Sequence, residues 1–148
     1  VVQPLRDIVD EALAMTQVQL RDHNVRVHVR QDDGPEPMVT VAADRIHQVF
    51  LNLILNAVDA MPEGGDLTVE LAATATPEGG RVVLSDTGVG ITPEDQAGLF
   101  NPFFTTKPDG LGLGLFISQN IVENHRGTIS VESTPGQGTS FTIWLPAG

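Results

Sequence analysis

The chain of 148 residues has the length of one domain, and its 19 acidic and 8 basic residues give a formal net charge of -11. This charge excludes nucleic acid and anionic membrane surfaces as expected partners, because both would repel the chain. The absence of cysteine excludes disulfides and thiolate metal sites and fits a reducing, cytoplasmic location. No uncharged run reaches the roughly 18 residues of a membrane span, so any membrane anchor of the parent protein is expected elsewhere.

The N-terminal part predicts one helix and one strand. Apolar residues recur at helical spacing from Leu5 to Leu13, with charged residues between them, which indicates an amphipathic helix that contributes core packing. From Val25 to Arg30, valines alternate with basic residues, the period of a strand with one solvent-exposed face. Turn-forming residues at 32–37 are expected to end this strand.

The clearest helix is predicted from Asp44 to Met61, where the apolar positions follow the helical period throughout. Its polar strip consists of Asn52, Asn56 and Asp59, which share one face at spacings of four and three residues. Two amides and a carboxylate beside leucines indicate an enclosed polar site, since burying such groups without partners is costly. The alternative is that these side chains only form hydrogen bonds to neighbouring backbone.

Two further strands are predicted at residues 67–71 and 81–86, separated by a turn at residues 77–80, and they could pair as an antiparallel hairpin. The second strand ends at Asp86, which is followed by Gly88 and Gly90. A carboxylate at the end of a strand is well placed to accept a hydrogen bond from a ligand. The alternative is an ordinary capped turn, because Asp and Gly are common turn residues.

Residues 92–109 are predicted to form a lid. Thr92 is expected to cap a short helix that begins with Pro93. The following stretch has no clear period but contains half of the six phenylalanines of the chain, which indicates rings that dock while the backbone moves. Lys107, the only lysine, lies close to a glycine cluster; its alternative interpretation is a solvated surface residue.

Three glycines at alternate positions, Gly110, Gly112 and Gly114, precede a helix that is predicted to end near Arg126. Glycine inside a helix or strand costs conformational entropy. The glycines are therefore expected at a helix N-terminus, where unpaired N–H groups can bind phosphate, or else in a flexible turn. Two last strands are predicted around residues 129–131 and 141–145, with a turn at residues 135–138.

These elements predict an α+β two-layer sandwich, with three main helices over one face of a mixed sheet of about five strands. The order of the strands does not follow from the sequence. Two other phosphate-binding motifs are excluded by spacing. A P-loop requires Gly-Lys-Ser/Thr after a strand, and a dinucleotide fingerprint requires G-x-G-x-x-G, neither of which matches residues 107–114.

Five ordered motifs together resemble the ATP-binding catalytic domain of bacterial sensor histidine kinases, above all their nitrogen-regulatory branch. The matching motifs are the N box (Asn52 to Ala57), the G1 box (Asp86 to Gly90), the F box (Phe100 to Lys107), the G2 box (Gly110 to Leu115) and the G3 box (Gly138-Thr139). The resemblance covers residues 1–148 and implies one catalytic domain with the Bergerat-type ATP-binding fold. Type II topoisomerases, heat-shock chaperones and mismatch-repair ATPases share this fold.

The resemblance also implies ATP and Mg²⁺ as ligands. Asp86 would accept a hydrogen bond from the adenine amino group, and Gly88 and Gly90 would let the backbone lie close to the base. Asn56 would bind Mg²⁺, and Asn52 would assist at the phosphates or at the water shell of the metal. With Lys107, which would hold the phosphates, these two asparagines are the catalytic candidates. The remaining implied nucleotide contacts are Asp59, Thr105, Thr106, Gly110, Leu111, Gly112, Leu113, Gly114 and Thr139.

Asn52 also bears on the reaction. Hydrolysing members of the wider family carry an acidic general base at this position, four residues before the metal-binding Asn, whereas an amide cannot take a proton from water at neutral pH. The resemblance therefore implies transfer of the γ-phosphoryl group to a partner rather than efficient hydrolysis.

The acceptor is expected on another domain, because none of the four histidines is followed by an acidic residue as a phosphoacceptor would be. The implied partners are the histidine-bearing dimerisation domain of the same kinase and a response regulator receiver domain. The isolated domain is expected to be monomeric and the full kinase homodimeric.

Two alternatives remain open. The triplet Asp86-Thr87-Gly88 is also the D-T-G of aspartic proteases, in which a single-copy chain would dimerise to bring two carboxylates together. Alternatively, the same fold would serve as a nucleotide-sensing or protein-docking module without transfer activity.

Overall fold

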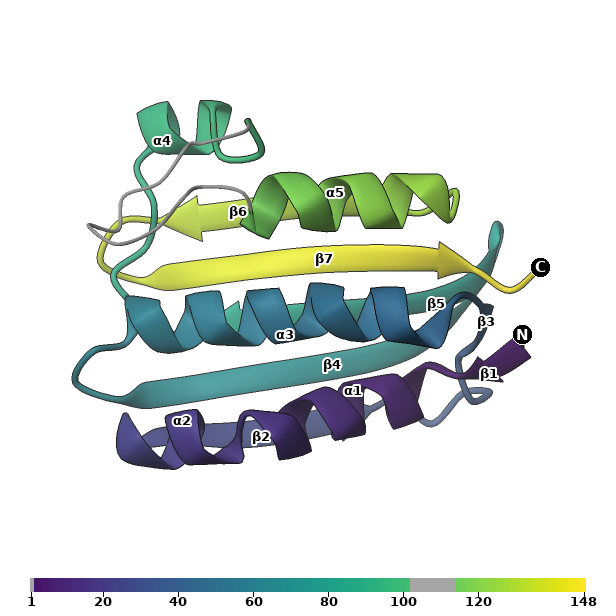
Figure 1. Ribbon diagram of the computed structural model, residues 1–148, viewed down its shortest axis with the longest axis horizontal. Coiled ribbons are helices and arrows are strands. Elements are labelled where there is room, and N and C mark those ends of the chain that lie inside the picture. The colour runs from purple at the N-terminus through teal and green to yellow at the C-terminus, as the bar shows by residue number, and fades with distance from the viewer. Residues whose placement is uncertain (1, 102–113) are drawn as a thin grey trace.

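The computed structural model describes residues 2–101 and 114–148. Five strands form one sheet in the order β2-β4-β5-β7-β6 (Figure 1). Their bounds are β2 Val25–Gln31, β4 Gly65–Ala75, β5 Glu78–Asp86, β6 Thr128–Thr134 and β7 Gly138–Pro146. Strands β2 and β4 run parallel, while the other neighbours are antiparallel, so the predicted mixed sheet is confirmed.

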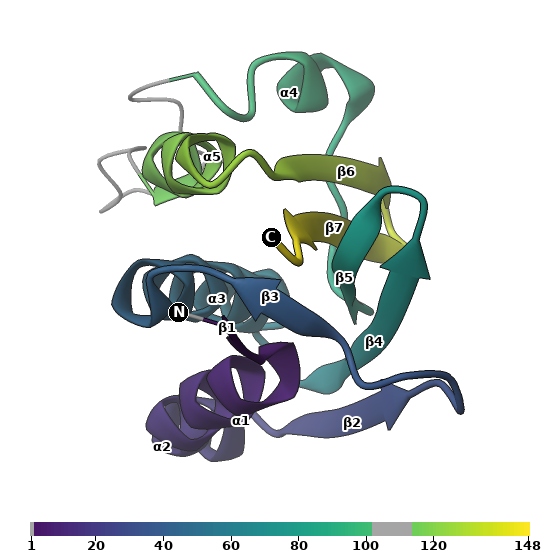
Figure 2. The same cartoon turned by 90° about the vertical axis from the view of Figure 1, so that its right-hand side faces the viewer.

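The helices are α1 Leu5–Met15, α2 Gln17–Asp22, α3 Ala43–Ala60, α4 Pro93–Ala97 and α5 Gly114–Asn124. Helices α1, α2, α3 and α5 lie in a single layer on one face of this sheet, while the short α4 lies beyond its β6 edge, as Figure 2 shows. The three predicted main helices correspond to α1, α3 and α5, and α3 lies between the other two (Figure 1). The two-layer α+β sandwich is thus confirmed.

The core lies between the two layers. On α3 the buried residues Ile46, Val49, Phe50, Leu53 and Ile54 follow the spacing of one helical face. They pack against alternate residues of the sheet, including Leu67, Val69, Leu84, Ile143 and Leu145. Removing this apolar surface from water stabilises the domain and fixes α3 over the middle of the sheet. Within the two described ranges, no helix is long and apolar enough to cross a membrane.

Three short elements are absent from the sequence prediction. Strands β1 (Val2–Pro4) and β3 (Met38–Thr40) form a separate antiparallel pair, and α2 follows α1 directly after Thr16. Elements of three to six residues are too short to display a hydrophobic period, so only tertiary contacts reveal them.

The predicted turn at residues 77–80 is wrong for most of its length. Residues Glu78 to Gly80 already belong to β5, where they pair with β4 on one side and Gly79 and Gly80 pair with β7 on the other. A Cβ built on Gly79 would overlap the backbone oxygen of Leu145. Glycine at this position therefore permits close packing of the strand rather than a turn.

Candidate functional site

The predicted polar strip of α3 is present, but it is not uniformly enclosed. Asn52 and Asn56 are half-buried, whereas Asp59 is exposed. The carboxamide nitrogen of Asn52 donates to the hydroxyl oxygen of Ser118 at 3.2 Å and to the backbone oxygen of Gly114 at 3.4 Å. The strip therefore begins at the contact between α3 and α5.

Asp86 lies half-buried at the end of β5, as predicted. Its Oδ1 accepts hydrogen bonds from the backbone N–H of Gly88 at 2.9 Å and of Thr139 at 3.2 Å. Burial raises the pKa of the Asp86 carboxyl above its ordinary value, and the two backbone hydrogen bonds oppose this rise. The Asp86 Oδ1 is thus occupied by contacts within the protein, and these contacts also fix the orientation of Oδ2.

The glycines after Asp86 are required by close backbone contacts. A Cβ on Gly88 would overlap the backbone oxygen of Ala60 at the end of α3, and the N–H of Val89 donates to the same oxygen at 3.0 Å. Gly90 has a φ of +77° and its Cβ would overlap the backbone oxygen of Thr134. These contacts join the Asp86 loop to the C-terminal end of α3 and to β6.

A hydroxyl network that sequence reasoning missed surrounds Thr139, which is buried. The Ser133 hydroxyl accepts from the N–H of Ile91 at 2.7 Å, donates to the backbone oxygen of Gly138 at 2.9 Å, and lies 2.8 Å from the Thr139 hydroxyl. From α4, the side-chain Nε2 of Gln96 donates to the backbone oxygens of Ile91 at 2.9 Å and of Ser133 at 3.0 Å. A serine in an alternating strand pattern gives no signal of this role.

The beginning of the predicted lid agrees with expectation. The Thr92 hydroxyl accepts from the N–H of Asp95 and caps α4. The ring of Phe100 packs edge-on against Phe141 of β7, with ring centroids 6.5 Å apart. The remainder of the lid, from residue 102 to 109, lies outside the described residues.

Seven of the predicted phosphate-binding residues also lie outside the described residues. They are Thr105, Thr106, Lys107, Gly110, Leu111, Gly112 and Leu113. Gly114, the eighth, is the exposed first residue of α5. Of the three glycines, Gly114 is the one within the described residues, and it begins a helix, as predicted.

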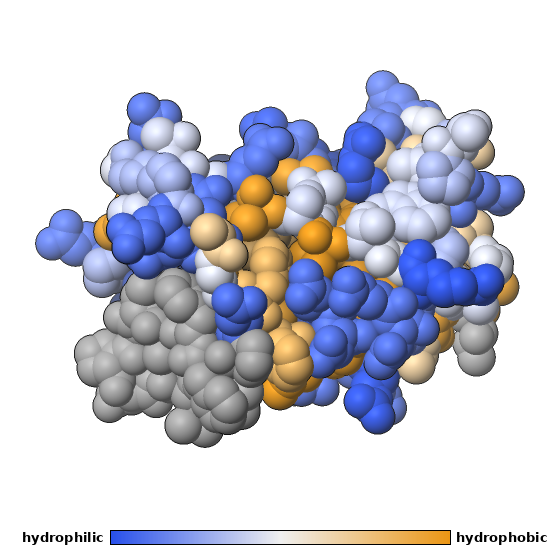
Figure 3. Space-filling model, turned by 90° about the horizontal axis from the view of Figure 1, so that it is seen from above, coloured by the Kyte–Doolittle hydropathy of each residue, from blue (hydrophilic) through white to orange (hydrophobic). Residues whose placement is uncertain are grey.

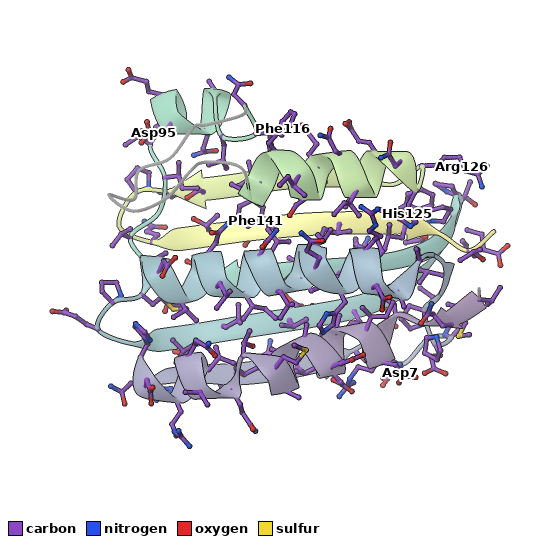
Figure 4. The ribbon with its side chains drawn as sticks, viewed as in Figure 1. Asp7, Asp95, Phe116, His125, Arg126 and Phe141 are labelled. Atoms are coloured by element: carbon purple, nitrogen blue, oxygen red, sulfur yellow. The ribbon has the colours of Figure 1, made fainter. Side chains whose placement is uncertain are left out.

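At its other end, α5 is tied to α3 by His125, which Figure 4 shows at the end of the helix opposite to Phe116. The imidazole Nδ1 donates to the backbone oxygen of Ile121 at 2.7 Å, and Nε2 accepts from the N–H of Ala42 at 3.1 Å. Both ring nitrogens of His125 are thus engaged in contacts that hold the fold together.

Three further observations on the described residues concern binding. Within the described ranges, no group of three or more His, Asp or Glu side chains is arranged to hold a metal ion. A hollow of about 250 Å³ lies over β2, β4 and β5, away from the Asp86 loop, and its lining includes Arg30, Glu70 and Arg81. On the side of α4 and α5, apolar side chains gather in a strip (Figure 3).

Comparison with known proteins shows the family. Residues 41–148 match the family model described as histidine kinase-, DNA gyrase B- and HSP90-like ATPase. The sensor histidine kinase ZraS of Salmonella typhi is 39% identical over 144 residues, which cover 96% of this chain and 30% of ZraS. The chain thus spans less than a third of the length of this relative.

Solved structures agree with this result. The nucleotide-free catalytic domain of histidine kinase ThkA has a TM-score of 0.87 at 30% identity, covering 99% of this chain and 95% of that one. Full-length ShkA in complex with AMPPNP has a TM-score of 0.85 at 25% identity, covering 98% of this chain and 31% of ShkA. The expected ATP-binding fold is confirmed, and the chain belongs to the family of histidine kinase-, DNA gyrase B- and HSP90-like ATPases as the ATPase domain of a sensor histidine kinase.

Proposed function

We propose that residues 1–148 form one catalytic domain that binds Mg-ATP and transfers the γ-phosphoryl group to a histidine on a separate dimerisation domain of a two-component sensor kinase. The observation that carries this proposal is the placement of Asp86. Its Oδ1 is held by two backbone N–H groups, which orients the second oxygen to accept from the adenine amino group. AMPPNP in the ShkA complex is an ATP analogue, which supports adenine nucleotide as the ligand.

The α3 strip fits a magnesium ion that is bound together with a nucleotide. Mg²⁺ prefers oxygen ligands, keeps several waters, and is usually held by one or two protein side chains plus phosphate oxygens. Asn56 would supply one such oxygen, while Asn52 and Asp59 on the same face would contact the water shell. A site of this kind needs no cluster of acidic residues.

The phosphates are proposed to lie at the N-terminal end of α5. Unpaired N–H groups and the helix dipole favour anions there, and Gly114 begins this helix. Thr105, Thr106, Lys107 and residues 110–113 would complete the site, with Lys107 supplying positive charge in a chain of net charge -11. Thr139 would lie near the adenine end, beside Asp86.

The mechanism follows from what the side chains can and cannot do. When bound, Mg²⁺ would neutralise charge on the β- and γ-phosphates. The domain would hold the γ-phosphoryl group in place, while Asn52 cannot remove a proton from water to start hydrolysis. The attacking group would therefore be a neutral imidazole nitrogen of the partner histidine, whose lone pair needs no base to free it. Its bond to the γ-phosphorus would form as the bond from that phosphorus to the β–γ bridging oxygen breaks, and ADP would leave with the electron pair.

Several partners follow from this proposal. The histidine-bearing dimerisation domain of the same kinase would dock on the face that exposes the apolar strip (Figure 3). ThkA has been solved with the response regulator protein TrrA, which supports a receiver domain as the next partner. We propose a monomeric isolated domain, a homodimeric full kinase in the cytoplasm, and no nucleic-acid partner.

The two alternatives are less well supported. In the D-T-G triplet, Asp86 Oδ1 is held by backbone N–H groups and the Thr87 hydroxyl accepts from the N–H of Asp66, so both polar side chains are engaged within one domain. The matched family is an ATPase family, which favours nucleotide binding over proteolysis. The other alternative, a nucleotide-sensing or protein-docking module, would transfer no phosphoryl group, and a transfer assay distinguishes it from a kinase domain.

The test is a transfer assay with the histidine-bearing helical domain of a sensor kinase and γ-labelled ATP. We expect an acid-labile phosphohistidine on the added domain and none on the 148-residue chain. A variant of the added domain without its histidine is the control. Nucleotide binding without any transfer would favour the sensing or docking module instead.

A further inference from the structure

Ser118 is a polar residue on the buried face of α5. Its side chain is fully buried, and the other buried residues of this helix are Ile121 and Val122. A hydroxyl in such surroundings is costly unless it is hydrogen-bonded. Its partner is the carboxamide nitrogen of Asn52 on α3, at 3.2 Å.

The second contact of Asn52 decides how its carboxamide is turned. The same nitrogen lies 3.4 Å from the backbone oxygen of Gly114, one turn before Ser118. A carbonyl oxygen only accepts hydrogen bonds, so the nitrogen of Asn52 must face α5 and Oδ1 must point away from that carbonyl. This excludes the flipped carboxamide, which would bring two oxygens together.

The contact with Gly114 is too long to hold this orientation alone. Hydrogen bonds between N–H and oxygen are usually 2.7–3.2 Å long, so the 3.2 Å contact with Ser118 is the stronger of the two. Gly114 is moreover the exposed first residue of α5, while Ser118 is buried in the core. The Gly114 carbonyl therefore selects which end of the Asn52 carboxamide faces α5, and the Ser118 hydroxyl holds the carboxamide in that position.

We propose that Ser118 is a positioning residue, which acts through Asn52 to present the Asn52 Oδ1 as an acceptor to a water of the Mg²⁺ shell. This inference rests on the proposed function, because it assigns an atom of the same site. Without the Ser118 hydroxyl, only the 3.4 Å contact with the Gly114 carbonyl would hold the carboxamide, which would then turn more freely and present its oxygen to the metal-bound water for less of the time. A nitrogen donor there would oppose the hydrogen atoms of that water.

The test compares affinities for a non-hydrolysable ATP analogue with and without Mg²⁺ by calorimetry. In Ser118→Ala, the gain in affinity that Mg²⁺ provides is expected to fall about three- to tenfold, while the affinity without Mg²⁺ stays unchanged. Ile121→Val is the matched control, since it trims another buried side chain of α5 and is expected to leave both affinities unchanged. In the Asn52→Ala background, Ser118→Ala is expected to have no further effect.

A second measurement, by NMR, observes the carboxamide directly. The signals of the Asn52 side-chain NH2 group are identified by their disappearance in Asn52→Asp. In Ser118→Ala, but not in Ile121→Val, these signals are expected to change their chemical shifts and their hydrogens to exchange faster with water. Equal losses of affinity with and without Mg²⁺, or an undiminished effect of Ser118→Ala in the Asn52→Ala background, would show that Ser118 contributes only packing. Failure of the unsubstituted chain to bind any Mg-nucleotide would instead overturn the proposed function itself.

Discussion

At the scale of single residues, the half-buried charge of Asp86 lowers the stability of the fold but is placed to bind a ligand. Burial raises its carboxyl pKa above the ordinary value of 3.8, so the charged form costs stability at neutral pH. This cost is relieved as the pH falls through the raised pKa, since the folded state then binds the proton before the unfolded state does. Because the charged form lowers stability at neutral pH, we infer that this carboxylate serves ligand binding rather than folding.

The pH dependence of nucleotide affinity follows from the same residue. Protonation of Asp86 turns an acceptor oxygen into a donor, so affinity for an ATP analogue should fall as the pH is lowered, beginning above 3.8. Calorimetry at stepwise lower pH measures this loss. Asp86→Asn, already weak, should lack the acidic limb; an identical limb in both proteins would assign it to another group.

Asn52 underlies a second prediction at this scale. The domain should hydrolyse ATP at a rate that phosphate-release assays cannot distinguish from a protein-free control, because Asn52 offers no general base. Neither Asn52→Ala nor Asn56→Ala should change that rate. Robust turnover that is lost in Asn56→Ala but kept in Asn52→Ala would contradict the proposed division between transfer and hydrolysis.

The sequence identifies some of these residues and not others. Asp86 and Asn52 were predictable because an acid at a strand end and an amide beside leucines on a mostly apolar helix depart from the local pattern. Ser118 and Ser133 do not depart from it, since an isolated serine suits a helix surface or a strand equally well. Only their tertiary contacts, with Asn52 in one case and with Ile91 in the other, distinguish them.

At the scale of elements, two glycines should respond differently to alanine. Gly114→Ala adds a Cβ that, among the described residues, meets only Asn52 Cγ, at 4.0 Å, so thermal stability should be kept or slightly raised while nucleotide binding weakens. Gly88→Ala should lower the free energy of unfolding by about 1–3 kcal/mol, because its Cβ overlaps the backbone of α3. Thermal unfolding and calorimetry on both variants measure the contrast.

Equal losses of stability and binding in Gly114→Ala would contradict this prediction. The glycine stretch would then be a structural turn, and a helix N-terminus that binds phosphate would lose its support.

The elements with a clear hydrophobic period were predictable, and their ends were less so. Helix α3 was expected from 44 to 61 and extends from Ala43 to Ala60. The start of β5 was misplaced because Gly79 and Gly80 suggest a turn, whereas pairing with two neighbouring strands requires small residues there. Local preference is overruled where two strands flank a third.

At the scale of the whole molecule, the site is assembled by the order of the strands. Because β5 and β7 are neighbours, Asp86 lies opposite Thr139, although 53 residues separate them in the chain. The end of α3 reaches the same region through the contact of Val89 with Ala60. Motif residues were predictable one by one, but this convergence required strand order, which periodicity does not encode.

The central claim is that this domain binds Mg-ATP through Asp86, and calorimetry with a non-hydrolysable ATP analogue tests it most directly. The unsubstituted chain should bind, and more tightly with Mg²⁺ than without it. Asp86→Asn should lose roughly tenfold to hundredfold in affinity with thermal stability unchanged or higher, since its amide oxygen still accepts from Gly88 and Thr139. Absence of binding in the unsubstituted chain, or equal affinity in Asp86→Asn, would contradict the claim.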